Sequence, residues 1–213
     1  MTTLLLVRHG QSLANLEKVF AGNYDAPLTE LGIQQARRTG EFVAENYAVD
    51  AIYSSDLSRA WETARAASRL LGLPVEKAPA LREIRAGKWE GRPFEEIAVK
   101  YPRDWQIWKE DVGHSRCTGG ESAMELAERV HAGLTEIARA NPGKTVLVAT
   151  HAVPIRTMQL RMSGRGPEYM KNIPWVTNAS VTELRWEDGV FTPVKISQDA
   201  HLADMRTNLP ANV

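Results

Sequence analysis

The sequence has little cysteine, no excess of charge of either sign and no long apolar run, and each absence narrows the classes of protein that it fits. Its one cysteine, Cys117, cannot form a disulfide within the chain, which favours a reducing compartment. Lysine and arginine together number 26, as do aspartate and glutamate, so no net charge attracts nucleic acid or anionic lipid. The apolar run 4–7 stops at Arg8, too early for a secretory leader or for the roughly 20 residues of a membrane-spanning helix. We therefore expect a cytoplasmic protein that binds neither nucleic acid nor membranes.

Short apolar or β-branched runs predict the strands of the fold. Three runs have the composition of strands that are buried on both faces: 4–7, 51–55 and 145–150. Two more runs, 180–186 and 190–196, flank the turn sequence EDG and predict an antiparallel hairpin.

Helical patterns lie between these strands. The length of 213 residues fits one domain covering 1–213. The patterns follow Thr29, cover 57–71 before the stop signal Gly72, follow Pro93 and cover 121–140. This alternation predicts an α/β fold, a three-layer sandwich with a mainly parallel central sheet, helices on both faces and an antiparallel edge hairpin.

Charged and imidazole side chains follow the predicted strands at the point where each strand ends. Arg8 and His9 follow the first strand, His151 follows the strand 145–150, and Arg59 lies within about one helical turn of the end of 51–55. Ligands of such sheets bind in the crevice beyond the carboxyl ends of the strands. We therefore expect two arginines and two histidines to meet in one crevice, although each residue taken alone also fits a solvated strand end or a surface ion pair.

This set of side chains suits phosphoryl transfer. The planar guanidinium group matches phosphate oxygens, and a histidine can serve as the nucleophile that forms a covalent phosphohistidine. Gly10 is expected to let the backbone approach the ligand, and Asn15 to donate a further hydrogen bond. The leaving alkoxide also needs an acid, for which a carboxyl group of raised pKa is suited. His9 is expected to be exposed at the strand end, so that His9→Ala leaves the fold intact.

Six stretches of sequence together carry a resemblance. They are RHGQSLAN, GNYDAPLTELGIQQA, YSSDLSRAWETA, LREIRAGKWEGRP, GGES and ATHAVPIR, in order between about residues 4 and 180. In this order they resemble the histidine phosphatase superfamily, which has the phosphoglycerate-mutase-like fold.

The resemblance implies a role for individual residues. It implies that His9 is the phosphorylated nucleophile, that Arg8, Arg59 and His151 bind the phosphate, and that Glu83 is the proton donor and acceptor. Spacing alone does not distinguish Glu83 from the other acidic residues. The resemblance further implies that Asn15 and Gly22 line the ligand pocket, as does Ala152, which stands where the family commonly has glycine.

The resemblance leaves several activities open. The sequence EIRAGKWEGRPFEEI after the acid is similar to the phosphatase branch, including alpha-ribazole phosphatases and broad-specificity phosphatases, and lacks the basic and aromatic insertion of the mutases. We therefore expect a phosphomonoesterase acting on a small phosphorylated metabolite. The alternatives are a cofactor-dependent phosphoglycerate mutase and a phospho-ligand binding protein without turnover, and the presence of both His9 and Glu83 argues against the last.

The region around the expected site leaves further alternatives open. The segment at about 89–120 is expected to form a helical lid, in which Trp105 and Trp108 either line the cavity or pack in the core. Three basic residues near Glu83 fit either a site for a second acidic group of the substrate or a solvated face: Arg85, Lys88 and Arg92.

No metal or cofactor is expected. The remaining histidines, His114, His131 and His201, lack the spacing of metal ligands. An even charge is compatible with a homodimer.

Overall fold

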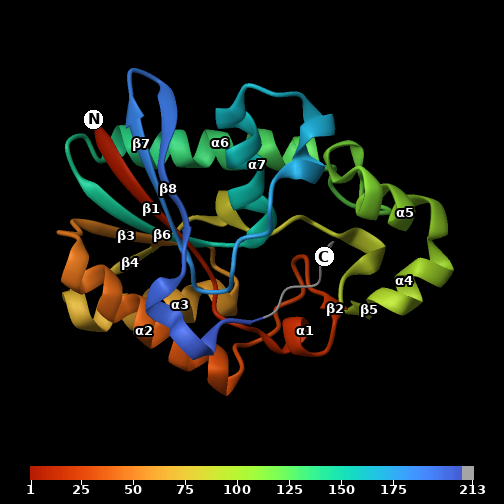
Figure 1. Cartoon of the computed structure of the whole chain (residues 1–213), viewed down its shortest axis with the longest axis horizontal. Helices are drawn as coiled ribbons and strands as arrows, with labels where there is room; N and C mark the ends of the chain where they lie inside the picture. The colour runs from red at the N-terminus through yellow and green to blue at the C-terminus, as the bar shows by residue number, and fades with distance from the viewer. Residues whose placement is uncertain (208–213) are drawn as a thin grey trace.

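The computed structural model describes residues 1–207 and contains a six-stranded central sheet with strand order β4-β3-β6-β1-β7-β8 (Figure 1). Its strands are β1 (Thr2–Arg8), β3 (Ala51–Ser54), β4 (Val75–Lys77), β6 (Thr145–Thr150), β7 (Val181–Glu187) and β8 (Val190–Gln198). The pairs β1–β6, β6–β3 and β3–β4 are parallel, whereas β7 and β8 form an antiparallel hairpin at one edge. The predicted α/β architecture and the edge hairpin are therefore confirmed.

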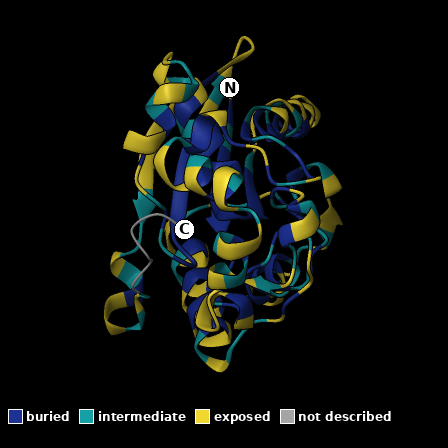
Figure 2. Ribbon diagram, turned by 90° about the vertical axis from the view of Figure 1, so that its right-hand side faces the viewer, coloured by how far each residue is buried: buried dark blue, intermediate teal, exposed yellow. Residues whose placement is uncertain are grey.

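Helices cover both faces of the sheet because successive side chains of each buried strand point to opposite sides. The α-helices are α1 (Leu13–Leu16), α2 (Glu30–Asn46), α3 (Ser58–Leu71), α4 (Phe94–Lys100), α5 (Pro102–Glu110), α6 (Ala123–Ala140) and α7 (Ala152–Ser163). Leu5 and Val7 pack with α2 and α3 on one face, whereas Leu4 and Leu6 pack with α6 and α7 on the other. Figure 2 shows that the strands are largely buried and that the exposed residues lie on the outer faces of the helices.

Local signals fix the ends of the helices. Thr29 caps α2 by accepting a hydrogen bond from the Gly32 amide, and α3 ends at Gly72, whose φ of 68° is accessible to glycine at little cost. The predicted helix 121–140 begins two residues later, at Ala123, because Ser122 and Glu125 form a capping box at its start. This leaves the Glu121 side chain outside the helix.

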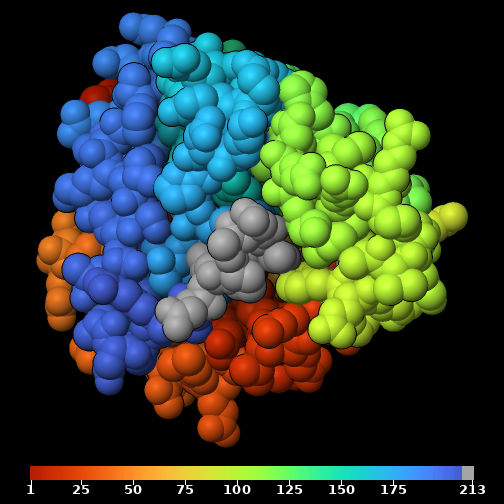
Figure 3. Space-filling view, turned by 45° about the vertical axis from the view of Figure 1, so that its right-hand side comes forward, coloured from red at the N-terminus to blue at the C-terminus, as the bar shows by residue number. Residues whose placement is uncertain are grey.

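The segment 89–120 forms a small subdomain of short elements beside the sheet. It holds β5 (Arg92–Pro93), which pairs with β2 (Val19–Phe20), followed by α4, α5 and the 3₁₀ turn η3 (Val112–His114). The other 3₁₀ turns of the fold are η1 (Pro79–Leu81), η2 (Gly87–Trp89), η4 (Pro167–Asn172) and η5 (Ala200–Met205). Figure 3 shows α4 and α5, in green, on the same face of the molecule as the light blue segment that contains η4. Within residues 1–207 no helix is both long enough and apolar enough to cross a bilayer.

The register between β1 and β6 positions the residues that follow both strands. Arg8 pairs with Thr150, and the next amide along, that of His9, donates to the Thr150 carbonyl oxygen at 3.0 Å. His9 and His151 therefore emerge next to each other at the carboxyl edge of the sheet.

Candidate active site

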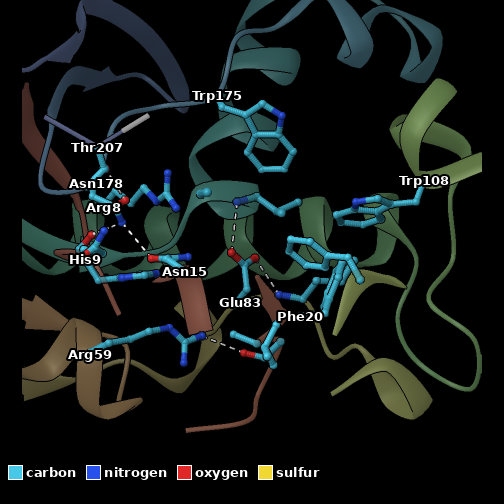
Figure 4. Close-up of a pocket in the computed structure, with 18 residues that line it drawn as sticks. Arg8, His9, Asn15, Phe20, Arg59, Glu83, Trp108, Trp175, Asn178 and Thr207 are labelled. Carbon is cyan, nitrogen blue, oxygen red and sulfur yellow. Dashed lines mark hydrogen bonds between the residues drawn. The ribbon is translucent and has the colours of Figure 1, made fainter. Parts of the chain in front are cut away.

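Most of the residues singled out from the sequence line one cavity at the carboxyl ends of the parallel strands (Figure 4). They are Arg8, His9, Asn15, Gly22, Arg59, Glu83 and Ala152. His151 lies directly behind His9, fully buried, with the two ring centroids 5.2 Å apart. The sequence-based expectation that His9 is exposed was wrong, since only 4% of this residue is accessible, because the end of β6 and the segment 176–180 pack against it.

His9 is held in one tautomer by its own loop. Its Nδ1 lies 2.7 Å from the Gly10 carbonyl oxygen, which only accepts, so Nδ1 carries the proton and the neutral ring keeps a free lone pair on Nε2. Burial, followed by the positive charges of Arg59 and Arg8, lowers the pKa of His9 well below its usual 6.5. The ring is therefore neutral near pH 7, as a nitrogen nucleophile has to be.

His151 is also neutral. It is the N-cap residue of α7, and its Nε2 lies 2.8 Å from the Ser55 hydroxyl oxygen at the end of β3. Burial, with Arg59 and His9 as further causes, lowers the pKa of His151 well below 6.5. Its Nδ1 is buried and has no hydrogen-bond partner within residues 1–207.

The two arginines are buried and fixed by backbone carbonyl groups. Arg8 donates from Nη1 to the Val176 carbonyl at 2.6 Å, and Arg59 donates to the carbonyls of Tyr24 at 3.0 Å and Gly22 at 2.8 Å. Burial lowers the pKa of each to about 10, so both stay charged at neutral pH. The Nε atoms of both are buried and have no partner in the described part of the chain, which leaves donors free to bind an anion.

Glu83 lies on an irregular loop and has the environment expected of an acid. Burial of its carboxyl group raises the pKa above the usual 4.5, and hydrogen bonds from the amides of Ile84 at 2.8 Å and Val153 at 3.4 Å oppose part of this rise. The same amides fix the direction of the carboxyl group in the cavity wall.

An arginine that the sequence analysis missed holds this loop in place. Arg129, on α6, donates to the carbonyl oxygens of Ala80 at 2.7 Å, Arg82 at 3.1 Å and Glu83 at 3.4 Å. Its Nε and Nη2 also form a two-pronged ion pair with the Glu121 carboxylate, at 2.9 and 2.8 Å. Glu121 belongs to the GGES motif, which was the one available signal, whereas Arg129 looks like any charged residue of an amphipathic helix.

Asn178 is a second residue that was missed, because it lies in an irregular segment without a motif. It is fully buried, and its Nδ2 donates to the His9 carbonyl at 3.1 Å and to Asn15 Oδ1 at 3.2 Å. Thr207 donates to Asn178 Oδ1 at 2.8 Å. These bonds tie Asn15 to the loop that carries His9.

Glycine at two of the predicted positions is required by close packing. Gly22 has a φ of +50°, and a Cβ there would lie 2.6 Å from that of Ala86. A Cβ on Gly10 would lie 2.3 Å from the Gly32 carbonyl oxygen. Gly10 is therefore needed for the contact between its loop and α2, and the expected approach of its backbone to a ligand stays a prediction.

The tryptophans and the basic residues near Glu83 have different places relative to the cavity. Trp108 both lines the cavity and belongs to the core, whereas Trp105 is a core residue. Arg85, Lys88 and Arg92 do not line the cavity, and Arg92 pairs with Glu96. Within residues 1–207 no cluster of three or more histidine, cysteine or acidic side chains has the geometry of a metal site.

Comparison with known proteins identifies the family of the chain. Residues 4–199 match the sequence profile of the histidine phosphatase superfamily, branch 1. Over 204 residues the chain is 31% identical to phosphoserine phosphatase 1 of Hydrogenobacter thermophilus, covering 96% of each protein. It is also 31% identical over 191 residues to a probable phosphoglycerate mutase, GpmB, of Yersinia pestis, covering 88% of this chain and 86% of the other.

Two solved structures share the fold. YhfR of Bacillus stearothermophilus superposes with a TM-score of 0.90 at 30% identity, covering 95% of this chain and all of the other (100%). The alpha-ribazole phosphatase of Shigella flexneri superposes with a TM-score of 0.81 at 25% identity, covering 92% of this chain and 96% of the other.

Proposed function

The chain belongs to the histidine phosphatase superfamily, and on that premise we propose that it is a phosphomonoesterase that hydrolyses a small phosphorylated metabolite through phosphorylated His9. The observation that carries the proposal is the pairing of a neutral His9, beside two fixed arginines, with Glu83, whose pKa is raised, on the wall of the same cavity. Such opposed pKa shifts separate a nucleophile from an acid.

In the first step, His9 Nε2 attacks the phosphorus atom, and the bond from phosphorus to the ester oxygen breaks. The protonated Glu83 gives its proton to the departing oxygen, which leaves as an alcohol. Arg8 and Arg59 hold the equatorial oxygens and stabilise the charge that they carry in the transition state. The Nδ1 atom of His151 has no hydrogen-bond partner within residues 1–207, so it is the ring nitrogen suited to donate to the same phosphoryl group.

In the second step, water attacks the phosphohistidine, and the bond between nitrogen and phosphorus breaks. The Glu83 carboxylate takes a proton from the water, which restores the acid for the next turnover. Inorganic phosphate leaves, and the ring of His9 returns to its neutral state. Asn15 and Asn178 would keep the loop of His9 in one position through both steps, because their side chains are joined and Asn178 binds the His9 carbonyl.

The proposal is tested by incubating the purified chain with a panel of phosphate esters and measuring inorganic phosphate. We expect steady release that requires His9, together with phosphate bound covalently to that ring when the reaction is quenched with base. A mutase would instead convert 3-phosphoglycerate to its isomer without net release of phosphate, and a binding protein would retain phosphate esters without consuming them. Either result would replace the proposed activity.

A further inference from the structure

The cavity has two chemically different ends, separated by Glu83. His9, Arg8 and Arg59 form one end, whereas the wall on the other side of Glu83 is apolar (Figure 4). This apolar wall includes Phe20, Trp108 and Trp175, together with Phe94, which contacts Phe20. Ile84 and Val153 also line the cavity, next to Glu83. Because Glu83 is the proposed proton donor to the leaving oxygen, the apolar wall lies where the alcohol part of the ester would be.

The apolar wall carries no charged side chain that could pair with a second charged group of a substrate, although the buried Nε1 of Trp108 has no hydrogen-bond partner within residues 1–207. Among the described residues that line the cavity, the ionisable ones are Arg8, His9, Arg59 and Glu83, and the proposed reaction uses all of them. A carboxylate or ammonium group placed against the apolar wall would therefore lose water without gaining a counter-ion, which is strongly unfavourable.

The aromatic rings of this wall are fixed by their neighbours. Phe20 and Trp108 are 6% and 2% exposed and pack edge to face, with ring centroids 5.1 Å apart. Phe20 also contacts Phe94 edge to face, at 6.3 Å. These rings belong to β2, α4 and α5, so the small subdomain and the strand β2 that pairs with it supply one side of the wall.

Trp175 forms the other side and is backed by a buried arginine. The Arg156 guanidinium lies 3.9 Å from the centre of a Trp175 ring, and Arg156 is 3% exposed. Arg156 in turn donates to the carbonyl oxygens of Met170 and Ile173, at 2.9 and 2.8 Å. The stacked cation limits the movement of the ring, so Trp175 presents a fixed apolar surface to the cavity.

We propose that the substrate is a phosphate monoester of an uncharged, largely apolar alcohol, whose aromatic or alkyl body packs between Trp175 and the Phe20–Trp108 pair. This inference rests on the proposed phosphatase activity and narrows its substrate class. Fixed, water-excluding rings favour such a body because contact removes apolar surface of both partners from water and orders few side chains. It also predicts poor use of esters such as phosphoserine and 3-phosphoglycerate.

The test compares 2-phenylethyl phosphate with O-phosphoserine, using the whole chain and inorganic phosphate as the readout. Both are esters of primary alcohols, so the chemical step needs comparable help from the acid. We expect kcat/KM for 2-phenylethyl phosphate to exceed that for phosphoserine by at least about tenfold.

Two variants separate the role of the rings from a general loss of activity. Trp175→Ala should lower kcat/KM for 2-phenylethyl phosphate by about tenfold or more without lowering that for phosphoserine. Phe94→Ala, on the opposite side and also partly exposed, should act in the same direction. The matched control is Trp61→Ala, because Trp61 also has a cation over its ring, Lys77 at 5.5 Å, but does not line the cavity.

The outcomes distinguish the substrate class from the activity itself. A higher kcat/KM for phosphoserine, or equal losses for both esters in Trp175→Ala, would overturn the apolar substrate and leave the phosphatase activity in place. Failure of either ester, and of the wider ester panel, to release phosphate would overturn the proposed function together with this inference.

Discussion

The ring of His9 lies edge-on to the ring of His151, with centroids 5.2 Å apart and planes inclined by 61°. One nitrogen of each ring forms a hydrogen bond within the protein: Nδ1 of His9 with the Gly10 carbonyl, and Nε2 of His151 with the Ser55 hydroxyl. Because both pKa values are lowered by burial and by the neighbouring arginines, two imidazoles can share this space without mutual repulsion at neutral pH. The neutral state leaves His9 able to act as a nucleophile.

Replacing His9 removes the proposed nucleophile. His9→Gln should lower kcat by at least about 1,000-fold for every ester, because it removes the imidazole that forms the proposed covalent intermediate. Since His9 is buried, the thermal midpoint has to be measured beside activity, and each kcal/mol of lost stability should shift it by about 2–4 °C. A well-folded His9→Gln protein that keeps appreciable turnover would exclude the covalent mechanism.

Replacing Glu83 should affect esters according to their leaving group. Glu83→Gln should slow 2-phenylethyl phosphate by about 100-fold or more, because an alkoxide needs a proton as it departs. The same change should slow 4-nitrophenyl phosphate much less, since 4-nitrophenolate is stable without one. Equal losses, measured as kcat/KM for the two esters, would assign the acid to another residue.

The pH dependence follows from the two opposed pKa shifts. With their usual values, 6.5 for histidine and 4.5 for glutamate, a neutral His9 and a protonated Glu83 would seldom coexist. Lowering the first pKa and raising the second opens a range in which both forms are present. Activity should therefore fall as the pH drops through the lowered pKa of His9, and fall as the pH rises through the raised pKa of Glu83.

Two measurements check this dependence. Titration of the histidine ring signals by NMR should show His9 still neutral below pH 6.5. The ratio of kcat/KM for the unchanged chain to that for Glu83→Gln cancels the ionisation of the substrate, and it should decrease as the pH rises through the pKa of Glu83. A His9 signal that titrates at or above its usual pKa contradicts the prediction.

The ion pair between Arg129 and Glu121 predicts a positioning role. Arg129→Ala should reduce kcat/KM more for 2-phenylethyl phosphate than for 4-nitrophenyl phosphate, because the loop that presents Glu83 loses three carbonyl contacts. It should also destabilise the fold by about 2–4 kcal/mol, since the largely buried carboxylate of Glu121 loses its partner.

Controls for Arg129 come from the same helix and from its conservative substitute. Arg139→Ala, at an exposed position of α6, should leave both rates and the thermal midpoint nearly unchanged. Arg129→Lys keeps the positive charge but not the two-pronged geometry. It should therefore lose less stability than Arg129→Ala, while kcat/KM for 2-phenylethyl phosphate stays reduced relative to that for 4-nitrophenyl phosphate. Equal losses for the two esters would indicate a structural role only.

Close contact between the His9 loop and α2 predicts that substitution of Gly32 lowers stability and activity. A Cβ on Gly32 would lie 2.0 Å from the Gln11 carbonyl oxygen, so Gly32→Ala should push the loop away and destabilise the fold by about 1–3 kcal/mol. It should also lower kcat/KM. Gly143→Ala, whose Cβ meets nothing within 4 Å, should lose stability through its φ of +79° while kcat/KM stays unchanged.

The sequence predicted the parts of this structure that are marked by an apolar run, by hydrophobic periodicity or by residues typical of helix ends. Buried strands such as Thr145–Thr150 and the capped α2 follow from apolar runs and helix caps, and the convergence of Arg8, His9, Arg59 and His151 follows from their places at strand and helix ends. Glu83 and Asn178 lie on irregular segments, where no period marks which side chain points inward. Glu83 was identified through family resemblance, and Asn178 was missed.

Burial was the other quantity that the sequence did not reveal. His9 follows a strand directly, which suggests a solvated end, yet the end of β6 and the segment 176–180 cover it through contacts between residues far apart in the chain. Arg129 was misjudged for a similar reason. Its position on an amphipathic helix is typical of a surface residue, but in the structure the loop that begins at η1 packs against it. Both depend on tertiary contacts that local sequence does not encode.

The pairing of Arg8 with Thr150 has a consequence for how activity can arise during folding. A slip of one residue between β1 and β6 would turn His9 and His151 to opposite sides of the sheet and separate them. A chain with misaligned central strands would then be catalytically silent, however compact it was. Recovery of turnover during refolding should thus report the alignment of these two strands, and should lag behind probes that detect collapse alone.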